Sequence, residues 1–253
     1  MSYERYSPSG FGFLPPVVKN LLIINGLFFL ATIVLENTSH IDLTDYLGLH
    51  YFVSQNFKTY QFVSYMFMHG NFSHIFFNMF ALWMFGSVLE HAWGPKKFLT
   101  YYMITGIGAG FMQVLVIYIQ VQNIELNLTP DLIAQVRETG FQILQNNQNF
   151  SDPQMGKLNL LYNMTTIGAS GSVFGLLLAF GMLFPNSLIY LYFFIPIKAK
   201  WFVIIYGAIE LFSGVYYTGS NVAHFAHLGG MIFGFFLIIY WKKKDGHRSD
   251  YMQ

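Results

Sequence analysis

Six long apolar stretches constrain the fold of this chain more than any other feature of its sequence. A helix crosses the hydrocarbon core of a bilayer with roughly 20 mostly apolar residues, within a range of about 17 to 25. The stretches of that length are Val17–Leu35, Phe72–Leu89, Phe98–Val121, Ile167–Phe184, Trp201–Tyr217 and Val222–Trp241. They predict an all-α polytopic membrane protein with six transmembrane helices, with five or seven as the alternative counts.

The composition agrees with a membrane protein, since 54% of the residues are hydrophobic and only 10% are charged, against about 25% charged in soluble domains. We expect one membrane domain, residues 17–241, between an N-terminal segment, residues 1–16, and a basic tail, residues 242–253. Another apolar stretch, Leu188–Ile197, is too short to span a bilayer and contains Pro196. It predicts a re-entrant turn or a loop against the inner membrane surface.

The basic residues predict the orientation, because lysine and arginine accumulate on the cytoplasmic side. With six spans, ten basic residues share the side of both termini and three lie on the opposite side. The ten are Arg5, Lys19, Lys96, Lys97, Lys198, Lys200, Lys242, Lys243, Lys244 and Arg248, and the three are Lys58, Arg137 and Lys157. We therefore expect both termini in the cytoplasm. No small-residue cleavage site follows the first span, which favours its retention in the mature protein.

Composition also excludes several kinds of chemistry. The chain has no cysteine, which excludes disulfides, thiolate catalysis and cysteine-ligated metals. A net charge of +1 favours no nucleic-acid partner, because topology accounts for the basic residues. We expect no cofactor and no metal.

One polar insertion, from about Gln122 to Asn163, lies on the predicted outer side. Its Gln/Asn-rich run, 145–149, is typical of a flexible loop. Thr129 before Pro130 is a helix-start signal, and the apolar residues that follow recur at helical spacing. We expect a short amphipathic helix on the membrane surface, which serves either as a connector or as a guide for substrates.

Two polar side chains occupy matching positions in two predicted spans. Ser170 lies a few residues into the fourth span, and His227 lies about five residues into the sixth. Both spans run from outside to inside in the predicted topology, so a rise of 1.5 Å per residue puts both side chains roughly 5–8 Å below the outer end. Because a histidine activates a serine hydroxyl by taking its proton, these positions favour nucleophilic catalysis within the membrane.

The second span supplies two further polar groups at the same level. His74 and Asn78 are four residues apart and share one helical face. An imidazole and an amide can stabilise a negatively charged tetrahedral oxygen together with the backbone N–H of Ser170, each donor contributing about 3 kcal/mol. Ionisable groups inside a span are functional candidates, because burying them without partners is costly.

Each of these residues also has a structural interpretation. A lone serine in a membrane helix more often bonds its own backbone, and Asn78 could be an interhelical hydrogen-bonding residue. The small-xxx-small pairs Gly171–Gly175 and Gly230–Gly234 are typical of close helix packing, which would let the fourth and sixth helices approach.

Histidines raise two other hypotheses. A metal cluster could form from His69, His74, His224 and His227. A small transporter could use His74, His224 and His227 as a proton relay.

Other intramembrane hydrolases have signatures that this sequence lacks. There is no His-Glu-x-x-His zinc motif, and no aspartate lies inside a predicted span. The Gly-x-Ser-x-Gly elbow is absent, because Ser172 stands two residues after Ser170. Ser172 lies about 200° around a helix from Ser170, so it cannot share the same role.

Three motifs stand at the predicted spans in this order: His69-Gly-Asn-Phe-Ser-His74-Ile-Phe-Phe-Asn78, Gly168-Ala-Ser170-Gly171, and Ala226-His227-Leu-Gly-Gly230-x-x-x-Gly234. Through these motifs the chain resembles the rhomboid family of intramembrane serine proteases over nearly its whole length. The resemblance implies a six-helix rhomboid-like bundle.

The resemblance also implies a role for each matching residue. Ser170 is the expected nucleophile and His227 the expected general base and acid, whereas spacing alone leaves His224 as an equal candidate. His74 and Asn78 would line the oxyanion hole. Supporting positions are Gly168, Gly171, Phe174, which is expected to pack on the imidazole, and Gly230, a helix-packing glycine.

We expect a dyad rather than a triad, because Glu210, midway along the fifth span, is expected to lie too deep to orient His227. The implied partners are the lipid bilayer and single-span membrane proteins, cut at or near the outer edge of their span. A bacterial inner (plasma) membrane is the expected location. The alternative function is a catalytically inactive, rhomboid-like factor that binds membrane proteins.

Overall fold

The computed structural model describes residues 14–191, 194–216 and 223–250, with side chains described as far as residue 244. Some predicted features lie outside these residues. They are residues 1–13 of the N-terminal segment, the end of the fifth span at Tyr217, the start of the sixth at Val222 and residues 251–253 of the tail.

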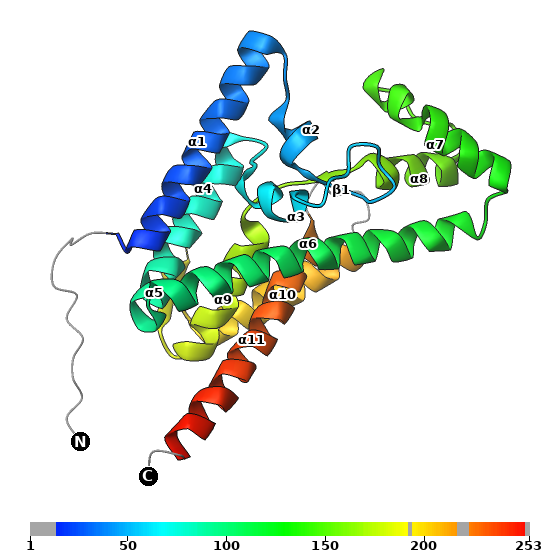
Figure 1. Ribbon diagram of the computed structural model, residues 1–253. Helices are drawn as coiled ribbons and strands as arrows, with labels where there is room; N and C mark the ends of the chain where they lie inside the picture. Colours follow the sequence, from blue (N-terminus) through cyan, green and yellow to red (C-terminus); the bar gives the residue numbers. More distant parts are fainter. Residues whose placement is uncertain (1–13, 192–193, 217–222, 251–253) are drawn as a thin grey trace.

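Five helical segments of the described chain are long and apolar enough to cross a membrane, which confirms a multi-pass membrane protein (Figure 1). They are α1 (Pro16–Ser39), a continuous helix of α4 (Phe72–Ala81), η2 (Leu82–Gly86) and α5 (Ser87–Trp93), then α6 (Pro95–Glu125), α10 (Ala199–Tyr216) and α11 (His224–Asp250). The middle segment of the composite helix, η2, is one π-helical turn.

The fourth predicted span is shorter than expected. It corresponds to α9 (Ser170–Leu183), which has 14 residues and is therefore about 21 Å long, less than the roughly 30 Å hydrocarbon core. The predicted start at Ile167 is wrong, since Thr165 and Thr166 form strand β2 and Gly168 has a φ of 121°. The count of six spans therefore stays a prediction.

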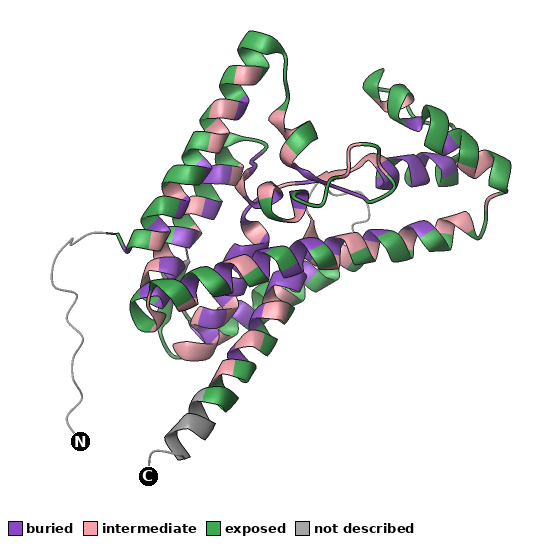
Figure 2. Cartoon of the chain, in the orientation of Figure 1, coloured by how far each residue is buried: buried purple, intermediate pink, exposed green. Residues whose placement is uncertain are grey.

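The outer faces of the long helices are apolar and exposed (Figure 2). Leu27 of α1 is 60% exposed, Phe77 of α4 67%, Ile204 of α10 58% and Phe236 of α11 64%. Soluble monomers rarely expose contiguous apolar surface on this scale. These faces suit contact with lipid acyl chains.

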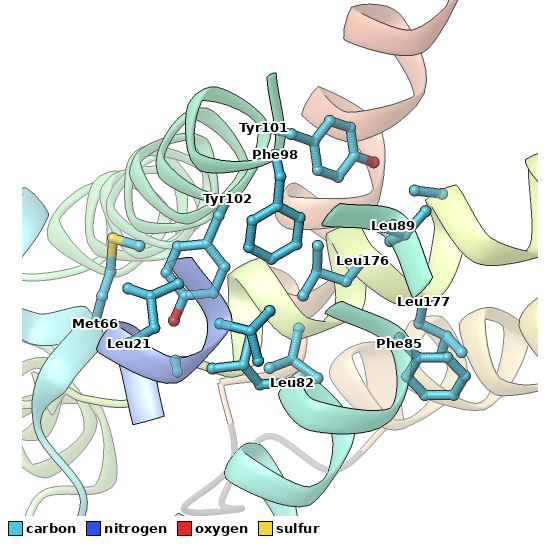
Figure 3. Packing of buried hydrophobic residues seen from close by; sticks show 14 of the residues in the cluster. Leu21, Met66, Leu82, Phe85, Leu89, Phe98, Tyr101, Tyr102, Leu176 and Leu177 are labelled. Carbon is cyan, nitrogen blue, oxygen red and sulfur yellow. The ribbon is translucent and has the colours of Figure 1, made fainter. Parts of the chain in front are cut away.

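The interior of the bundle is built where α6, α9 and α11 pack on one another. Phe98, Tyr101 and Tyr102 of α6 are fully buried, and they belong to one hydrophobic cluster with Leu176 and Leu177 of α9 (Figure 3). In a protein surrounded by water, burying a large apolar side chain stabilises the fold by about 1.5–3 kcal/mol. Lipid is itself apolar, so this gain is small between helices in a membrane. In the membrane, close packing and interhelical hydrogen bonds therefore hold these helices together.

Glu90 of α5 ties the start of α1 to the end of the composite helix. This carboxylate is 2% exposed and accepts the backbone N–H groups of Val17 at 3.0 Å and Val18 at 2.8 Å, one on each oxygen. These N–H groups belong to the first turn of α1, where a helix has no partners of its own and favours negative charge. Glu90 therefore caps α1 from a distant part of the chain.

Replacing Glu90 with glutamine is expected to destabilise the protein by about 1–3 kcal/mol. The amide nitrogen would face one backbone N–H, so one of the two hydrogen bonds becomes a contact between donors. The measurement is the midpoint of thermal unfolding in detergent micelles, with the exposed Glu138→Gln variant as the control. Equal midpoints for the Glu90 variant and the wild type would contradict a capping role.

The segment between α1 and α4 is folded rather than extended. It contains α2 (Leu43–Leu47), strand β1 (Leu49–His50), α3 (Gln61–Ser64) and the short helix η1 (Tyr65–Phe67). Strand β1 pairs antiparallel with β2 (Thr165–Thr166), and the N–H of Gly168 donates to the carbonyl of Tyr65 at 2.9 Å. These bonds hold the chain just before Ser170.

The insertion contains two helices rather than the one that was predicted. The first, α7 (Pro130–Gln145), begins directly after Thr129, as predicted. The second, α8 (Pro153–Asn163), was not expected, although Asp152 caps it by accepting the N–H groups of Gln154 and Met155 at 2.9 Å each. An aspartate before a proline is a helix-start signal.

Polar contacts fasten these two helices to the end of α6. The guanidinium of Arg137 donates to Glu125 at 2.9 Å and to the Tyr162 hydroxyl at 3.1 Å, and that hydroxyl donates to Glu125. Burial raises the pKa of Tyr162 to about 12, so the phenol keeps its proton. The insertion is thus a folded element of the bundle.

The short apolar stretch 188–197 was predicted as a re-entrant turn or a loop, but much of it forms strands. Strands β3 (Leu188–Leu191) and β4 (Ile195–Lys198) form an antiparallel pair. Isoleucine, which both strands contain, and tyrosine, which β3 contains, favour strands, and Pro196 lies in a two-stranded ribbon, which has only edge strands, where proline is tolerated.

Candidate active site

Ser170 is the first residue of α9, because the backbone at Gly168 is not helical. Gly168 adopts a φ of 121°, a conformation that favours glycine, and Ala169 forms the N-cap. The serine is partly exposed, whereas Ala169 and Gly171 beside it are buried. The backbone N–H groups in the first turn of α9 have no partners within the helix, so the positive end of the helix dipole surrounds the hydroxyl.

The structure brings Ser170 and His227 into direct contact. The hydroxyl Oγ of Ser170 lies 2.8 Å from Nε2 of His227, although 57 residues separate them in the chain. His227 lies in the first turn of α11 and is 8% exposed. This distance suits transfer of a proton from a serine to a histidine.

Glycines make this contact possible. A Cβ atom on Gly230 of α11 would lie 1.9 Å from the carbonyl oxygen of Gly171 of α9, and a Cβ on Gly171 would lie 2.4 Å from Ala109 of α6. The two helix backbones therefore touch at the level of the serine. The second glycine of each pair packs on α6 instead, Gly175 against Thr105 and Gly234 against Tyr101.

Phe174, one turn along α9 from Ser170, covers one face of the His227 ring. The ring centroids are 4.1 Å apart and the planes are inclined by 7°. The ring of Phe174 also contacts the ring of Tyr206 of α10, with ring centroids 5.0 Å apart. The imidazole is thus held between its hydrogen bonds and an aromatic surface, which limits its rotation.

His74 lies close to Gly168 and Ser170. A Cβ atom on Gly168 would be 2.7 Å from Nε2 of His74 and 3.6 Å from Oγ of Ser170, so both groups border the same small space. His74 is in the first turn of α4, where its backbone N–H donates to the N-cap residue Asn71 at 2.8 Å. The absence of a side chain at Gly168 leaves that space open.

Asn78 is buried, and its amide Nδ2 donates to the carbonyl of His74 at 2.9 Å, one turn earlier in the same helix. The amide therefore bonds its own helix rather than a neighbouring one. An amide nitrogen carries two protons, so this bond leaves one to donate elsewhere. Helix α4, which carries Asn78, packs on α9.

His69 lies beside His74, with ring centroids 5.0 Å apart. It is 2% exposed, and burial together with the neighbouring His74 lowers the pKa of His69 to about 4. His69 is therefore neutral at ordinary pH. Its position in the loop before α4 supports the His74 ring rather than reaching Ser170.

The prediction that Glu210 lies too deep in the fifth span to orient His227 is wrong. Its Oε2 lies 2.9 Å from Nδ1 of His227 and 2.7 Å from Nδ1 of His224. Glu210 is six residues before the end of α10, whereas both histidines are in the first turn of α11. The packing of α10 on α11 brings these two levels together, and counting residues from the helix ends did not predict that contact.

A sequence signal for this contact did exist. Glu210 is an ionisable residue within an apolar span, where such groups pair with one another. His224 and His227 lie three residues apart on one face of the next helix, which makes them candidate partners for this carboxylate.

The same three side chains are the one set within the described residues whose ligand atoms could hold a metal ion, since Glu210, His224 and His227 offer atoms within 4.8 Å of one another. The four-histidine cluster suggested by the sequence does not form this set. The N···O distances of 2.7 and 2.9 Å are ordinary hydrogen-bond lengths.

Together, the helices and this site define a membrane-embedded bundle with a hydrogen-bonded serine–histidine pair near one end. The profile of the rhomboid domain matches residues 56–122 and 140–244, so the chain belongs to the rhomboid family. The matched ranges include α4, α9, α10 and most of α11.

The chain is also similar to the Rhomboid-like protein 11, chloroplastic, of Arabidopsis thaliana, with 31% identity over 103 residues. The aligned region covers 37% of this chain and 34% of that relative. The chain therefore matches about a third of the length of the curated relative.

Proposed function

We propose that this protein is an intramembrane serine endopeptidase in which Ser170 is the nucleophile and His227 is the general base and acid. The observation that carries the proposal is the 2.8 Å contact between Ser170 Oγ and His227 Nε2. A serine–histidine pair at hydrogen-bond distance is the arrangement that activates a hydroxyl for acyl transfer. It forms here among helices of a rhomboid-family bundle.

In the first step, Oγ of Ser170 attacks the carbonyl carbon of the scissile peptide while its proton passes to Nε2 of His227. The carbonyl oxygen then carries the negative charge of the tetrahedral intermediate. As the intermediate collapses, Nε2 returns the proton to the leaving amine nitrogen and the peptide C–N bond breaks. The product is an ester between the substrate carbonyl and Ser170.

Three groups can stabilise the oxyanion. The first is the amino end of α9, whose unpartnered N–H groups and dipole favour negative charge beside Ser170. The second is His74, whose Nε2 borders the same space. The third is the amide of Asn78, which has one proton beyond its bond to His74.

Hydrolysis of the ester repeats these steps with water. His227 takes a proton from a water molecule, the hydroxide oxygen attacks the ester carbonyl, and Nε2 returns the proton to Oγ of Ser170. Water must therefore reach the start of α9, and the partial exposure of Ser170 supports such access.

The proposed substrates are single-span membrane proteins, cut at or near the outer edge of their span. A chain that enters the site must be extended, so helix-destabilising residues near the cut would favour cleavage. The cytoplasmic location of both termini, the six-span count and a bacterial plasma membrane remain predictions within this proposal; the relative noted above is named as chloroplastic.

The same contact argues against the alternative of an inactive binding factor, since a member without catalytic function needs no paired hydroxyl and imidazole. A proton relay through His74, His224 and His227 would need no serine nucleophile, so covalent labelling of Ser170 distinguishes it from the proposal.

The test is covalent labelling of the purified protein with a fluorophosphonate probe, followed by peptide mapping. We expect the label on Ser170, together with cleavage of members of a panel of single-span substrates in liposomes. The matched control is Ser172→Ala, because Ser172 lies on the same helix but donates to the carbonyl of Tyr102 at 2.8 Å. This variant should keep its label, and a label that persists in Ser170→Ala would contradict the proposal.

A further inference from the structure

Glu210 is a buried carboxylate in the membrane that meets both histidines of α11. It is 5% exposed, and a single oxygen, Oε2, contacts Nδ1 of His227 and Nδ1 of His224. We infer that Glu210 is a positioning residue that orients His227, so that the proposed hydrolase works with a Glu–His–Ser triad, and that His224 holds Glu210 in place. This inference rests on the proposed function of Ser170 and His227.

The first step of the reasoning concerns the tautomer of His227. An ionised carboxylate only accepts hydrogen bonds, so a 2.9 Å contact with Oε2 requires the proton on Nδ1. Nε2 of a neutral imidazole then carries the lone pair, and Nε2 is the atom 2.8 Å from Oγ of Ser170. Glu210 therefore selects the one neutral tautomer that can take the serine proton.

The second step concerns charge. When Nε2 takes the proton, His227 becomes a cation with both nitrogens protonated, next to a carboxylate at hydrogen-bond distance. Opposite charges attract strongly where water is scarce, and the site lies among apolar helices. The proton stays on His227 until it returns to the leaving group, and the carboxylate keeps its charge throughout.

The third step concerns what holds Glu210 itself. An unpaired carboxylate within a span is costly, and such groups are kept by specific partners. His224 contacts the same oxygen at 2.7 Å from one turn earlier in α11, and its ring stands nearly perpendicular to that of His227, at 87°. The two histidines thus reach Glu210 from different directions and fix the position of Oε2.

Phe174 supports the same geometry from the opposite helix. It stacks on the ring of His227, and this contact restricts tilting of the imidazole out of its plane. Hydrogen bonds at both nitrogens then determine the remaining rotation of the ring in its plane. The ring is held by α9 on its face, by α10 at Nδ1 and by Ser170 at Nε2.

The kinetic test compares Glu210→Gln with wild type in liposomes, on a substrate that wild type cleaves. Removing the orienting carboxylate from a soluble triad lowers kcat by about 10⁴-fold, and we expect a decrease of at least about tenfold here. KM should stay within about twofold, because Glu210 does not touch the substrate. The matched control is Glu90→Gln, another buried carboxylate of the bundle, which should keep the wild-type kcat per folded molecule.

A decrease in kcat smaller than tenfold, or a loss confined to KM, would overturn the positioning role. Equal losses in the Glu210 and Glu90 variants would also overturn it, since that result would reflect general destabilisation. If the wild type neither cleaves nor labels, the proposed function fails instead, and the following measurement still decides the role of Glu210.

The second measurement uses the resting protein and needs no activity. Nitrogen-15 NMR of protein with labelled histidine reports the tautomer of each ring, and His227→Gln identifies the signal of His227. We expect His227 in the Nδ1-protonated form in both wild type and Ser170→Ala. A resting His227 protonated on Nε2 alone would exclude Glu210 as its hydrogen-bond acceptor.

Discussion

Alanine in place of His227 is expected to lower the rate of substrate cleavage by at least about 10³-fold, since loss of the histidine of a soluble serine protease costs about 10⁶-fold. The hydroxyl of Ser170 would lose the base that lies 2.8 Å away. Labelling by a fluorophosphonate should slow in parallel, because it requires the same activation. The rate of cleavage in liposomes and the rate of labelling are the two measurements.

His224→Ala is the matched control, because it removes an imidazole from the same helical face. His224 contacts Glu210, and its loss removes that support but not the His227 imidazole, so the variant should keep more than about a tenth of the activity. Equal losses in the two variants would contradict the choice of His227 over His224 as the base.

Gly230→Ala is expected to lower activity by about 100-fold or more, because a displacement of the reacting groups by about 1 Å can cost that much. The added Cβ would lie 1.9 Å from the carbonyl oxygen of Gly171, a separation that real atoms do not adopt. Since the obstacle is backbone, α11 must move away from α9. That movement lengthens the distance between His227 and Ser170.

The same substitution should also destabilise the bundle, because overpacking a tight interface typically costs about 1–3 kcal/mol. Unfolding in micelles and cleavage in liposomes measure the two effects. Gly26→Ala on α1 is the control, because a Cβ there would meet nothing within 4 Å, and alanine favours a helix. Wild-type activity in Gly230→Ala would contradict the close approach of α9 and α11.

Local patterns predicted much of this architecture. Apolar length located five long helices, and the proline after Thr129 located the start of α7. The same kind of signal at Asp152 and Pro153 also marks α8, but the Gln/Asn-rich run before it suggested a loop. The hairpin at residues 188–198 was missed because a short apolar stretch does not distinguish a strand from a turn.

The start of α9 could not be located by hydropathy. Ile167, Gly168 and Ala169 are apolar and extend the predicted span, yet they belong to a loop. Pairing of β2 with β1 and the bond from Gly168 to Tyr65 hold that loop. Both partners lie about a hundred residues away in the chain, so the beginning of the helix depends on long-range contacts.

The sequence by itself determined that this chain is a multi-pass membrane protein of the rhomboid type, because span length and short motifs are local properties. It also singled out Ser170 and His227 as a pair of candidates. Only the tertiary structure decided that Glu210 contacts His227, because the packing of α10 on α11 sets which levels of the two helices meet. That packing depends on side chains along the whole interface, a property that no single stretch of sequence carries.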